Sequence, residues 1–365
     1  MRIIQVLPTL AYGDAIGNET IALKDFFREA GYDSEIYYIN GIDYRIPKDT
    51  AQEITKIRLS IDDVLIYHLS SGTQWHYNIN DYHCHKIIRY HNITPPYFFE
   101  GYHDRLQRIC QEGYEGTKYL SNKVEFVLAD SDYNLQDLRN MGYDCPGEVA
   151  PIFLNLKNYE QRSDEKVLKQ VKKKGFTNFL FTGRIAPNKK MEDTIRAFYC
   201  YHHFINPKSR LFFVGNYTGI TKYYRCLCNY RDKLSLKKSV IFTGHLKDNQ
   251  VLAYYQLADA FVCMSEHEGF CVPLVEAMVF QVPILAYDSS AVSETLGGSG
   301  ILLKEKNPML IAEWMDRIVQ DKALRQMIIE KEKKRLQAFA EEQTKKKFLS
   351  CIQKVVNNKI GSLLQ

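Results

Sequence analysis

The sequence predicts an α/β protein of two doubly wound domains, and three observations support this. A chain of 365 residues exceeds what one hydrophobic core comfortably covers. Short apolar runs alternate with amphipathic stretches along the chain, as they do in parallel βα repeats. A highly charged segment, residues 157–174, separates two such series. We therefore place the domains at residues 1–155 and 156–345, and expect a ligand between them at the carboxyl ends of their strands.

The expected strands are short apolar runs, and the expected helices have one apolar face. The segment from residue 322 to residue 356 is almost entirely helical in composition. In the first domain we expect strands at 3–7, 34–38, 64–67, 86–90 and 126–129, a short strand within 147–155, and helices at 19–30 and 134–141. In the second we expect strands at 178–182, 211–214, 239–242, 260–264, 283–286 and 300–303, and helices at 191–203, 223–234, 250–257, 273–280 and 309–318.

Composition argues against several classes of protein. No stretch approaches twenty uninterrupted apolar residues, so we expect no membrane-spanning helix, and the N-terminus lacks the long apolar core of a signal peptide. The nine cysteines are scattered, which favours a reducing cytoplasm with buried free thiols. Neither Cys226-x-Cys228 nor His83-Cys84-His85 has a second half at zinc spacing, so we interpret both as structural.

The net charge of +5 is unevenly distributed. Lysines cluster at 172–174, 331–334 and 345–347, and such runs are usually solvated helix faces. The alternative is contact with an anionic membrane surface, where lipid-linked substrates reside. Nucleic-acid binding is not expected, because no aromatic-rich basic stretch or recognition motif accompanies the lysines.

The most informative stretch follows the expected strand at 260–264. Gly269 breaks the chain, and Pro273 stands where the first turn of a helix begins, a position at which its missing N–H costs nothing. The amides of Phe270, Cys271 and Val272 then point out of the helix start together. Free N–H groups at the positive end of a helix dipole form an anion site, most naturally for a phosphate.

Two carboxylates flank this anion site, Glu268 before it and Glu276 about one turn inside the helix. A carboxylate accepts two hydroxyl hydrogen bonds at once, so each could hold a diol of a sugar or ribose. This arrangement suits a nucleotide sugar, with one glutamate for each end. The alternative is a solvated loop glutamate and a helix-surface glutamate.

The loop after the expected strand at 178–182 carries two cations. Arg184 follows Gly183 directly, and Lys189 comes five residues after the arginine. Fixed positive charge here could stabilise a departing diphosphate and replace a metal ion, although both cations could instead be surface residues. After the strand at 239–242, His245 and Leu246 occupy a similar turn. We assign them a backbone role in reading a nucleotide base, with a surface histidine as the alternative.

The first domain contributes a glycine-bearing loop after its first strand. Gly13 and Gly17 allow close approach of backbone to a ligand, and Asn18 or Glu19 could cap the helix that follows. The glycine spacing is not that of a dinucleotide fingerprint. His91 lies just past the strand at 86–90, where a side chain enters the cleft, although an isolated histidine there is more often structural.

Asp130-Ser131-Asp132 matches a metal-binding Asp-x-Asp motif. Here the triplet follows a strand and precedes an amphipathic helix. We therefore interpret it as helix capping.

Two blocks of the C-terminal half resemble family 4 of the retaining glycosyltransferases. One is residues 264–283, in which seven residues separate Glu268 from Glu276, and the other is the Gly183-Arg184 pair followed by Lys189. Together these blocks are specific, whereas either alone would not be.

The N-terminal half matches the family more loosely, through the glycine-bearing loop and Tyr90-His91-Asn92. Residues 90–96 look like bacterial members that build cell-surface polysaccharides, including lipopolysaccharide. The resemblance implies a GT-B fold, with two Rossmann-like domains facing a cleft and a C-terminal helix, residues 346–365, packing on the first domain. It also implies a nucleotide-sugar donor bound mainly by the second domain, without a metal.

Residue roles follow from the resemblance by position. Glu276 would hold the ribose and Glu268 the donor sugar hydroxyls. His91 would contact the transferred sugar near the reacting carbon. Arg184 and Lys189, which follow Gly183, would neutralise the diphosphate. The phosphates would also contact the backbone of Gly269, Phe270, Cys271 and Val272. Gly13 and Gly17 would shape the loop of the first domain. We expect His91, Arg184, Lys189 and Glu268 to be catalytic.

The chain departs from the family at two places. Cys271 stands where many relatives carry glycine, which adds a thiol beside the phosphate. In the first loop, Asp14-Ala15-Ile16 separates two glycines that are often adjacent in relatives.

The resemblance implies transfer of a hexose, with retention, from a UDP-sugar or GDP-mannose to a glycan or lipid-linked acceptor in surface-polysaccharide synthesis. We expect a cytoplasmic enzyme, with the inner face of the membrane as a site of action. Two alternatives stay open: a nucleotide-sugar epimerase of the same fold, and a non-catalytic nucleotide-sugar binding protein.

Overall fold

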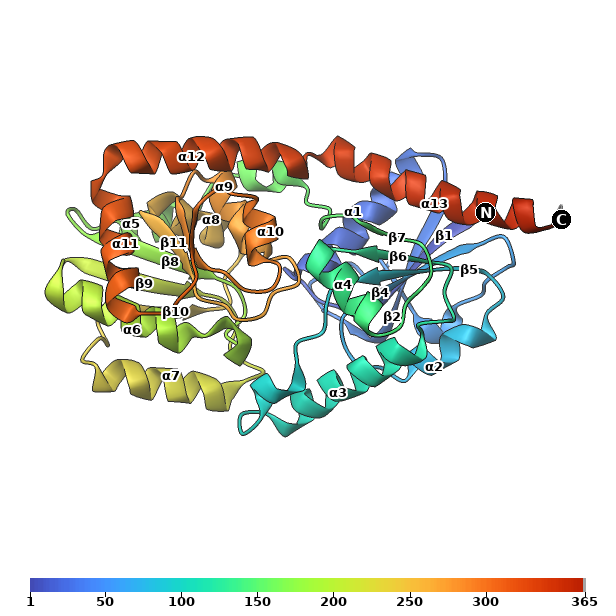
Figure 1. Cartoon of the computed structure of the whole chain (residues 1–365), viewed down its shortest axis with the longest axis horizontal. Helices are drawn as coiled ribbons and strands as arrows, with labels where there is room; N and C mark the ends of the chain where they lie inside the picture. The colour runs from blue at the N-terminus through green and yellow to red at the C-terminus, as the bar shows by residue number, and fades with distance from the viewer. Residues whose placement is uncertain (364–365) are drawn as a thin grey trace. The chain divides into compact units, whose positions relative to one another are not determined.

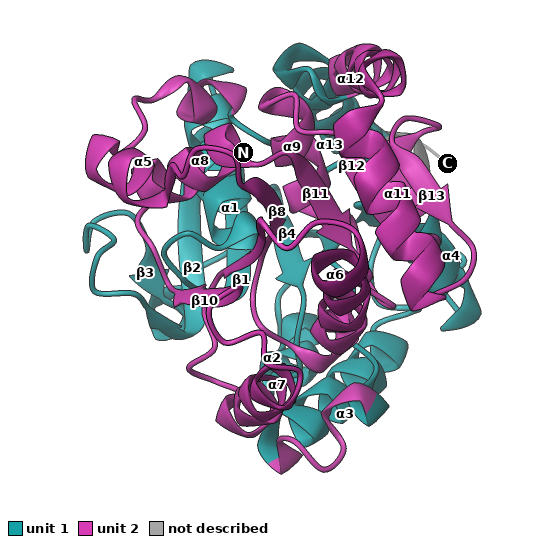
Figure 2. Ribbon diagram, turned by 90° about the vertical axis from the view of Figure 1, so that its left-hand side faces the viewer, with its two compact units in different colours: residues 1–97, 105–155, 339–365 teal, residues 98–104, 156–338 magenta. Residues whose placement is uncertain are grey.

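The computed structural model describes residues 1–363 and divides the chain into two compact units. Unit 1 contains Met1–Tyr97, Arg105–Asn155 and the chain from Phe339 on, whereas unit 2 contains Phe98–Asp104 and Leu156–Ala338 (Figure 2). The chain thus enters unit 2 after Asn155 and returns at Phe339, earlier than residue 346. The short excursion of Phe98–Asp104 into unit 2 was not predicted.

Unit 1 is built on a parallel sheet of seven strands in the order β3-β2-β1-β4-β5-β6-β7 (Figure 1). Its central strands are almost completely buried and mostly apolar, which explains why they could be predicted from the sequence. The strands are β1 (Arg2–Leu10), β2 (Asp33–Ile42), β3 (Gln52–Glu53), β4 (Val64–Leu69), β5 (His85–Tyr90), β6 (Phe126–Ala129) and β7 (Gly147–Val149). The helices are α1 (Ala15–Glu29), α2 (Trp75–Asn78), α3 (Asp104–Tyr119), α4 (Asp132–Asn140) and α13 (Glu341–Leu363).

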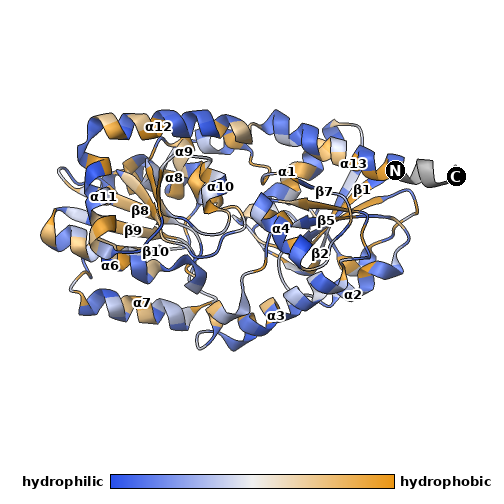
Figure 3. Cartoon of the chain, in the orientation of Figure 1, coloured by the Kyte–Doolittle hydropathy of each residue, from blue (hydrophilic) through white to orange (hydrophobic). Residues whose placement is uncertain are grey.

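Unit 2 is built on a second parallel sheet, of six strands in the order β10-β9-β8-β11-β12-β13. Figure 3 shows that its strands are mainly hydrophobic, whereas much of α12 is hydrophilic. The strands are β8 (Thr177–Thr182), β9 (Ser209–Val214), β10 (Val240–Gly244), β11 (Ala260–Cys263), β12 (Ile284–Tyr287) and β13 (Ile301–Leu303). The helices are α5 (Glu165–Val171), α6 (Met191–Phe204), α7 (Thr221–Lys233), α8 (Asp248–Leu257), α9 (Val272–Val279), α10 (Val292–Leu296), α11 (Pro308–Gln320) and α12 (Lys322–Leu336).

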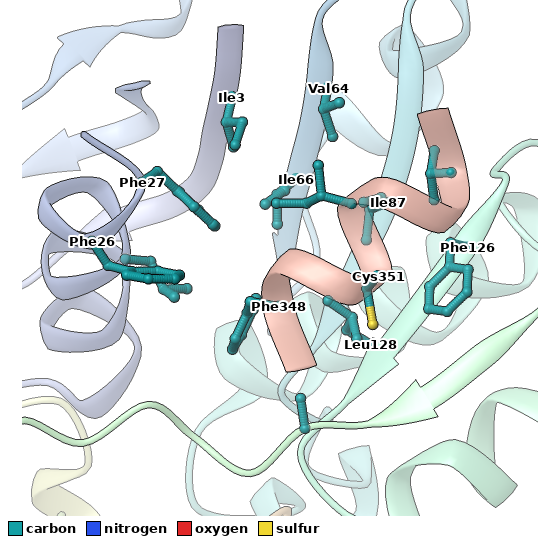
Figure 4. Close-up of a cluster of buried hydrophobic side chains, with 14 of the residues drawn as sticks. Ile3, Phe26, Phe27, Val64, Ile66, Ile87, Phe126, Leu128, Phe348 and Cys351 are labelled. Carbon is teal, nitrogen blue, oxygen red and sulfur yellow. The ribbon is translucent and has the colours of Figure 1, made fainter. Parts of the chain in front are cut away.

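The end of the chain belongs to the core of unit 1. In α13, Phe348, Cys351 and Ile352 are buried among side chains of α1 and the strands, including Phe27 and Ile87 (Figure 4). The expected continuous helix is interrupted between α12 and α13, where Gln337–Phe339 forms one 3-10 turn. No helix in the described part of the chain is long and apolar enough to cross a membrane.

Some lysines of the charged clusters bind within their own unit. Lys345 Nζ lies 2.6 Å from a carboxylate oxygen of Glu341, and Lys347 Nζ donates to the carbonyl of Val149 at 2.9 Å. Lys333 Nζ lies 3.1 Å from a carboxylate oxygen of Glu330. These contacts agree with solvated helix faces; membrane contact stays a prediction.

Candidate functional site

The order in which the chain adds strands to the sheet of unit 2 reverses between β8 and β11. From β8 the chain moves outward to β9 and β10, then returns to form β11 on the other side of β8. Open parallel sheets bind ligands at the carboxyl ends of the strands beside such a switch point. The loops that leave β8 and β11 are residues 183–190 and 264–271, the two stretches that the sequence singled out.

A buried asparagine fastens these two loops together. Asn188 Nδ2 donates to the carbonyl of His267 at 2.9 Å, and the Asn188 carbonyl accepts from the Glu266 amide at 2.8 Å. On the other side, the amide of Glu268 donates to Ser290 Oγ at 2.8 Å. The backbone on both sides of the candidate site is therefore held in place by hydrogen bonds.

The loops bring Lys189 and Glu268 into direct contact, with Lys189 Nζ against Glu268 Oε2. Burial lowers the pKa of Lys189. The carboxylate of Glu268 raises it by more, so the pKa of Lys189 lies above its usual value. Glu268 is only 6% exposed, and its Oε1 has no hydrogen-bond partner among the described residues. A buried carboxylate oxygen without a partner is costly, so it points to a hydroxyl supplied by a ligand.

Helix α9 begins where the sequence predicted a helix. Pro273 is its second residue, and Cys271 is the N-cap. The first-turn amides of a helix have no intrahelical acceptor, which makes this end of α9 suited to a phosphate. Cys271 has φ +71° and ψ +65°, the left-handed conformation that glycine adopts without strain. This conformation explains why glycine would suit the position.

Replacing Cys271 with glycine is expected to stabilise unit 2 by up to about 1 kcal/mol, because an L-residue pays roughly 1–2 kcal/mol in the left-handed region and glycine loses part of that gain in chain entropy. Urea denaturation measures the change. The matched control is Cys263→Ala, which removes a buried thiol in β11 without relieving backbone strain and should not stabilise. A destabilised Cys271→Gly variant would show that thiol packing outweighs the strain.

Glu276 is engaged by two tyrosines that the sequence analysis did not identify. Its Oε2 accepts from the Tyr255 hydroxyl at 2.7 Å, and its Oε1 accepts from the Tyr159 hydroxyl at 3.2 Å. Burial raises the pKa of Glu276, and the tyrosine hydroxyls partly oppose that shift. Tyr255 also lies 2.5 Å from Thr182 Oγ1 at the end of β8. Since each carboxylate oxygen keeps a second lone pair, a ribose diol can bind beside the tyrosines.

The other candidates of unit 2 lie at the same edge of the sheet. Gly183 has φ +134°, and Arg184 after it is exposed. The turn after β9 approaches this backbone so closely that a Cβ on Gly215 would lie 1.9 Å from the Gly183 carbonyl oxygen. His245 is exposed and Leu246 is half-buried. Both follow β10, an edge strand that β9 separates from β8, so they lie farther from the switch point than Lys189 does.

Each of the two glycines of the first loop is favoured at its position for a different structural reason. Gly13 has φ +72° immediately before α1. Gly17 lies inside α1, where an added Cβ would come within 2.8 Å of the Ala11 carbonyl oxygen. The expected capping by Asn18 or Glu19 is wrong, because Asp14 is the N-cap and accepts from the Gly17 amide.

His91 lies directly after β5, and the structure buries it in a polar cluster of unit 1. Its Nε2 lies 2.9 Å from His68 Nδ1, and its Nδ1 lies 3.1 Å from Asp130 Oδ2. The residue is 8% exposed. Asp130 thus pairs with His91, while Ser131 is the N-cap of α4, so capping in this triplet is confirmed for the serine.

The hydrogen bonds of this cluster determine where its protons lie. Gln5 Nε2 donates to the carbonyl of Thr20, so Gln5 Oε1 must accept from His68 Nε2 at 3.0 Å. Burial, with His91 and Arg89 nearby, lowers the pKa of His68 well below its usual value, so His68 is neutral and its Nδ1 is an acceptor. The proton between the rings therefore belongs to His91 Nε2. Nδ1 of His91 faces Asp130 Oδ2, so both ring nitrogens of His91 are engaged within the cluster.

Arg89 supplies the fixed positive charge of the cluster. It is completely buried and lies 2.8 Å from Glu19 Oε1 and 2.7 Å from Asp130 Oδ1. Its guanidinium thus pairs with both buried carboxylates, as buried charges require. Both ring nitrogens of His91 are already engaged, so contact between its side chain and a sugar would need a hydroxyl to displace His68 or Asp130. Its role in binding a sugar stays a prediction.

Comparison with known proteins agrees with this geometry. Residues 163–335 match the family model described as glycosyl transferases group 1. An uncharacterized glycosyltransferase, MJ1607 of Methanocaldococcus jannaschii, is 29% identical over 42% of this chain and 39% of its own. The serotype-specific mannosyltransferase WbdA of Escherichia coli is 31% identical over 24% of this chain and 11% of its own. The chain therefore spans well under half the length of these relatives.

Solved structures share the fold over almost the whole chain. Sucrose-phosphate synthase from Thermosynechococcus elongatus has a TM-score of 0.74 at 16% identity, covering 98% of this chain and 100% of its own. Anabaena HepE in complex with UDP-glucose has a TM-score of 0.75 at 13% identity, covering 97% and 100%. These similarities confirm the predicted GT-B fold.

Proposed function

Because residues 163–335 match the family model of the group 1 glycosyl transferases, we propose that the protein transfers a sugar from a nucleoside diphosphate donor to an acceptor hydroxyl. The observation that carries the proposal is the ion pair of the partly buried Lys189 with the buried Glu268, at the switch point of the unit 2 sheet. Its cation suits a diphosphate, and the unpartnered oxygen of Glu268 suits a sugar hydroxyl.

Different residues of unit 2 bind different parts of the donor. The start of α9, with the amides near Cys271 and Val272, takes the phosphates, and Lys189 with Arg184 neutralises their charge. Glu268 accepts from the sugar hydroxyls. Glu276 holds the ribose diol, with Tyr159 and Tyr255 orienting its carboxylate. The backbone at His245 and Leu246 meets the base.

The proposed reaction keeps the configuration of the sugar. The bond from the anomeric carbon to the diphosphate oxygen breaks, and the acceptor oxygen bonds to the same face. The acceptor proton passes to the departing phosphate oxygen. Lys189 and Arg184 stabilise the charge that develops on the diphosphate, as a metal ion would do elsewhere. Isolation of a covalent sugar–protein intermediate would contradict this one-step route.

We place the protein in the synthesis of a cell-surface polysaccharide at the cytoplasmic face of a membrane, with a glycan or lipid-linked acceptor and a hexose as the transferred sugar. The mannosyltransferase among the relatives supports GDP-mannose, and the UDP-glucose complex of HepE supports a UDP-sugar. The experiment that tests the proposal therefore includes both UDP-sugars and GDP-mannose as donors.

The experiment combines a donor panel with an acceptor assay. Thermal shift with UDP-glucose, UDP-galactose and GDP-mannose identifies the donor, and incubation with glycan or lipid-linked acceptors measures free nucleoside diphosphate and glycosylated product. Both products together support the proposal. Sugar isomerisation without an acceptor would instead indicate an epimerase, and donor binding with no turnover would indicate a binding protein.

Glu276→Ala is expected to weaken donor binding by about 1–3 kcal/mol, because hydrogen bonds to a charged group are lost. Titration calorimetry with the donor found by thermal shift measures the affinity. The matched control is Glu294→Ala, a half-buried glutamate of helix α10, which should leave donor affinity unchanged. Unchanged affinity of the Glu276 variant would remove Glu276 from the site.

A further inference from the structure

Two buried thiols lie beside the carboxylate of Glu268. Cys263 ends β11 and Cys271 caps α9, and both are buried. A hydrogen bond between these thiols lowers the pKa of Cys263 and raises that of Cys271. One sulfur from each cysteine and one carboxylate oxygen of Glu268 all lie within 4.8 Å of one another.

We propose that Cys263, Cys271 and Glu268 form a binding site for one thiophilic divalent cation of the zinc class. Zinc binds cysteine sulfur at about 2.3 Å and carboxylate oxygen at about 2.0–2.2 Å, so ligands on a tetrahedral ion lie about 3.5–3.8 Å apart. The present ligand atoms lie within 4.8 Å of one another, so binding of the ion would draw them closer together. Glu268 Oε1, buried and without a partner among the described residues, provides the oxygen ligand without breaking an existing hydrogen bond.

The charges and the ligand types both suit such an ion. On binding, the two thiols release two protons to the solvent, and two thiolates and one carboxylate then surround the cation. With the ammonium of Lys189 included, the charges sum to zero, as a buried site requires. Two sulfur ligands select zinc or cadmium over magnesium or calcium, which prefer oxygen.

The polar cluster of unit 1 is a weaker candidate. Glu19, His68 and His91 also place donor atoms within 4.8 Å of one another. However, the two ring nitrogens are 2.9 Å apart, closer than the roughly 3.3 Å expected for two nitrogen ligands of one zinc. The carboxylate of Glu19 is also already paired with the guanidinium of Arg89. A shared proton accounts for this contact, so the thiol pair of unit 2 carries the inference.

Occupation of the thiol site has a consequence that rests on the proposed function. A cation bound by Glu268 takes away the oxygen that would accept a sugar hydroxyl, and it stands beside the N-terminus of α9. Cation and donor therefore compete. A thiophilic ion would act as an inhibitor of donor binding, whereas magnesium would not.

Cadmium is the probe, because cadmium–thiolate bonds absorb in the ultraviolet. The reduced full-length protein is titrated with Cd²⁺, and Zn²⁺ and Mg²⁺ are added as competitors. We expect one Cd²⁺ per chain with the absorbance of two thiolates, lost on addition of Zn²⁺ and unaffected by Mg²⁺. No saturable absorbance, or displacement by Mg²⁺ as effective as that by Zn²⁺, would overturn the proposal.

Three variants locate the site. Cys263→Ala and Cys271→Gly should each weaken Cd²⁺ binding by at least about tenfold, since loss of outer-shell partners alone typically costs 10–100-fold. Glycine suits φ +71°, so the Cys271 variant keeps its fold. The control, Cys226→Ser, removes an exposed thiol on α7 and should bind as the wild type does. Wild-type affinity in both Cys263→Ala and Cys271→Gly would overturn the proposal.

A nucleotide-sugar arm separates this inference from the proposed function. With the site intact, UDP-glucose at about ten times its dissociation constant should raise the apparent dissociation constant for Cd²⁺ by about tenfold if its sugar hydroxyl binds Glu268. Cysteine-dependent Cd²⁺ binding that UDP-glucose does not affect would keep the cation site and contradict its overlap with the donor. UDP-glucose binding by calorimetry without any cysteine-dependent Cd²⁺ binding would keep the donor site and overturn the cation site.

Discussion

Replacing Arg89 with methionine is expected to destabilise unit 1 by about 3–5 kcal/mol, the usual effect of removing one partner of a buried ion pair. Arg89 is completely buried and contacts the carboxylates of both Glu19 and Asp130. Methionine fills similar volume, but it leaves the two buried carboxylates of Glu19 and Asp130 without this guanidinium. Glu19 also accepts a hydrogen bond from the Phe153 amide, so a displaced Glu19 would also affect the segment that follows β7.

The chain offers a probe specific to unit 1. Its two tryptophans are Trp75 in α2 and Trp314 in α11, one in each unit. In a Trp314→Phe background, urea denaturation followed by fluorescence therefore reports on the surroundings of Trp75. Arg45→Met is the control, because it removes an ion pair with Asp43 at the surface, which contributes about 0–1 kcal/mol. A loss below about 1 kcal/mol for Arg89→Met would contradict the role of Arg89 as the buried partner of both carboxylates.

A second carboxylate variant tests the same cluster further. Adding Glu19→Gln to Arg89→Met removes one of the two uncompensated negative charges. The double variant should therefore recover part of the stability, although each single change is destabilising. Additive losses would mean that Arg89 and Glu19 act independently, which their 2.8 Å contact contradicts.

Most strands could be predicted because parallel strands buried on both faces are continuous apolar runs. Helix α3 was missed for a physical reason. It buries small residues, among them Gly113 and Gly116, and a Cβ on Gly113 would lie within 2.9 Å of the Gly72 amide nitrogen. Glycine is a poor helix former, so tertiary packing here overrides the local signal. The two-residue β3 is too short to leave any pattern.

The sequence predicts those residues of the candidate site that lie in loops directly after apolar strands. Lys189 and Glu268 are 79 positions apart, and each was found as a charged residue in a loop that follows an apolar strand. Their direct contact depends on β8 pairing with β11, which sequence periodicity does not reveal. A usable signal in unit 1 was overlooked: His68 and Arg89 interrupt apolar strands, and polar groups at such buried positions need partners.

Lys189→Ala is expected to lower the turnover of sugar transfer by about 10²–10³-fold, the typical cost of removing one group that stabilises developing charge. The ammonium is already held against Glu268 and needs no rearrangement to meet the diphosphate. Its interaction with the diphosphate strengthens as the bond to the sugar breaks, so kcat should fall more than donor affinity does. Steady-state kinetics with the donor found by thermal shift measure both constants.

The neighbouring lysine separates a specific role from a general effect of positive charge. Lys190 lies 3.2 Å from Glu266, and its side chain is also partly buried. Lys190→Ala should leave turnover close to that of the wild type, whereas Lys189→Arg, which keeps the charge, should recover part of the activity lost in Lys189→Ala. Equal turnover in Lys189→Ala and the wild type would make Lys189 a structural partner of Glu268. Equal losses in Lys189→Ala and Lys190→Ala would attribute the effect to the overall potential of the loop.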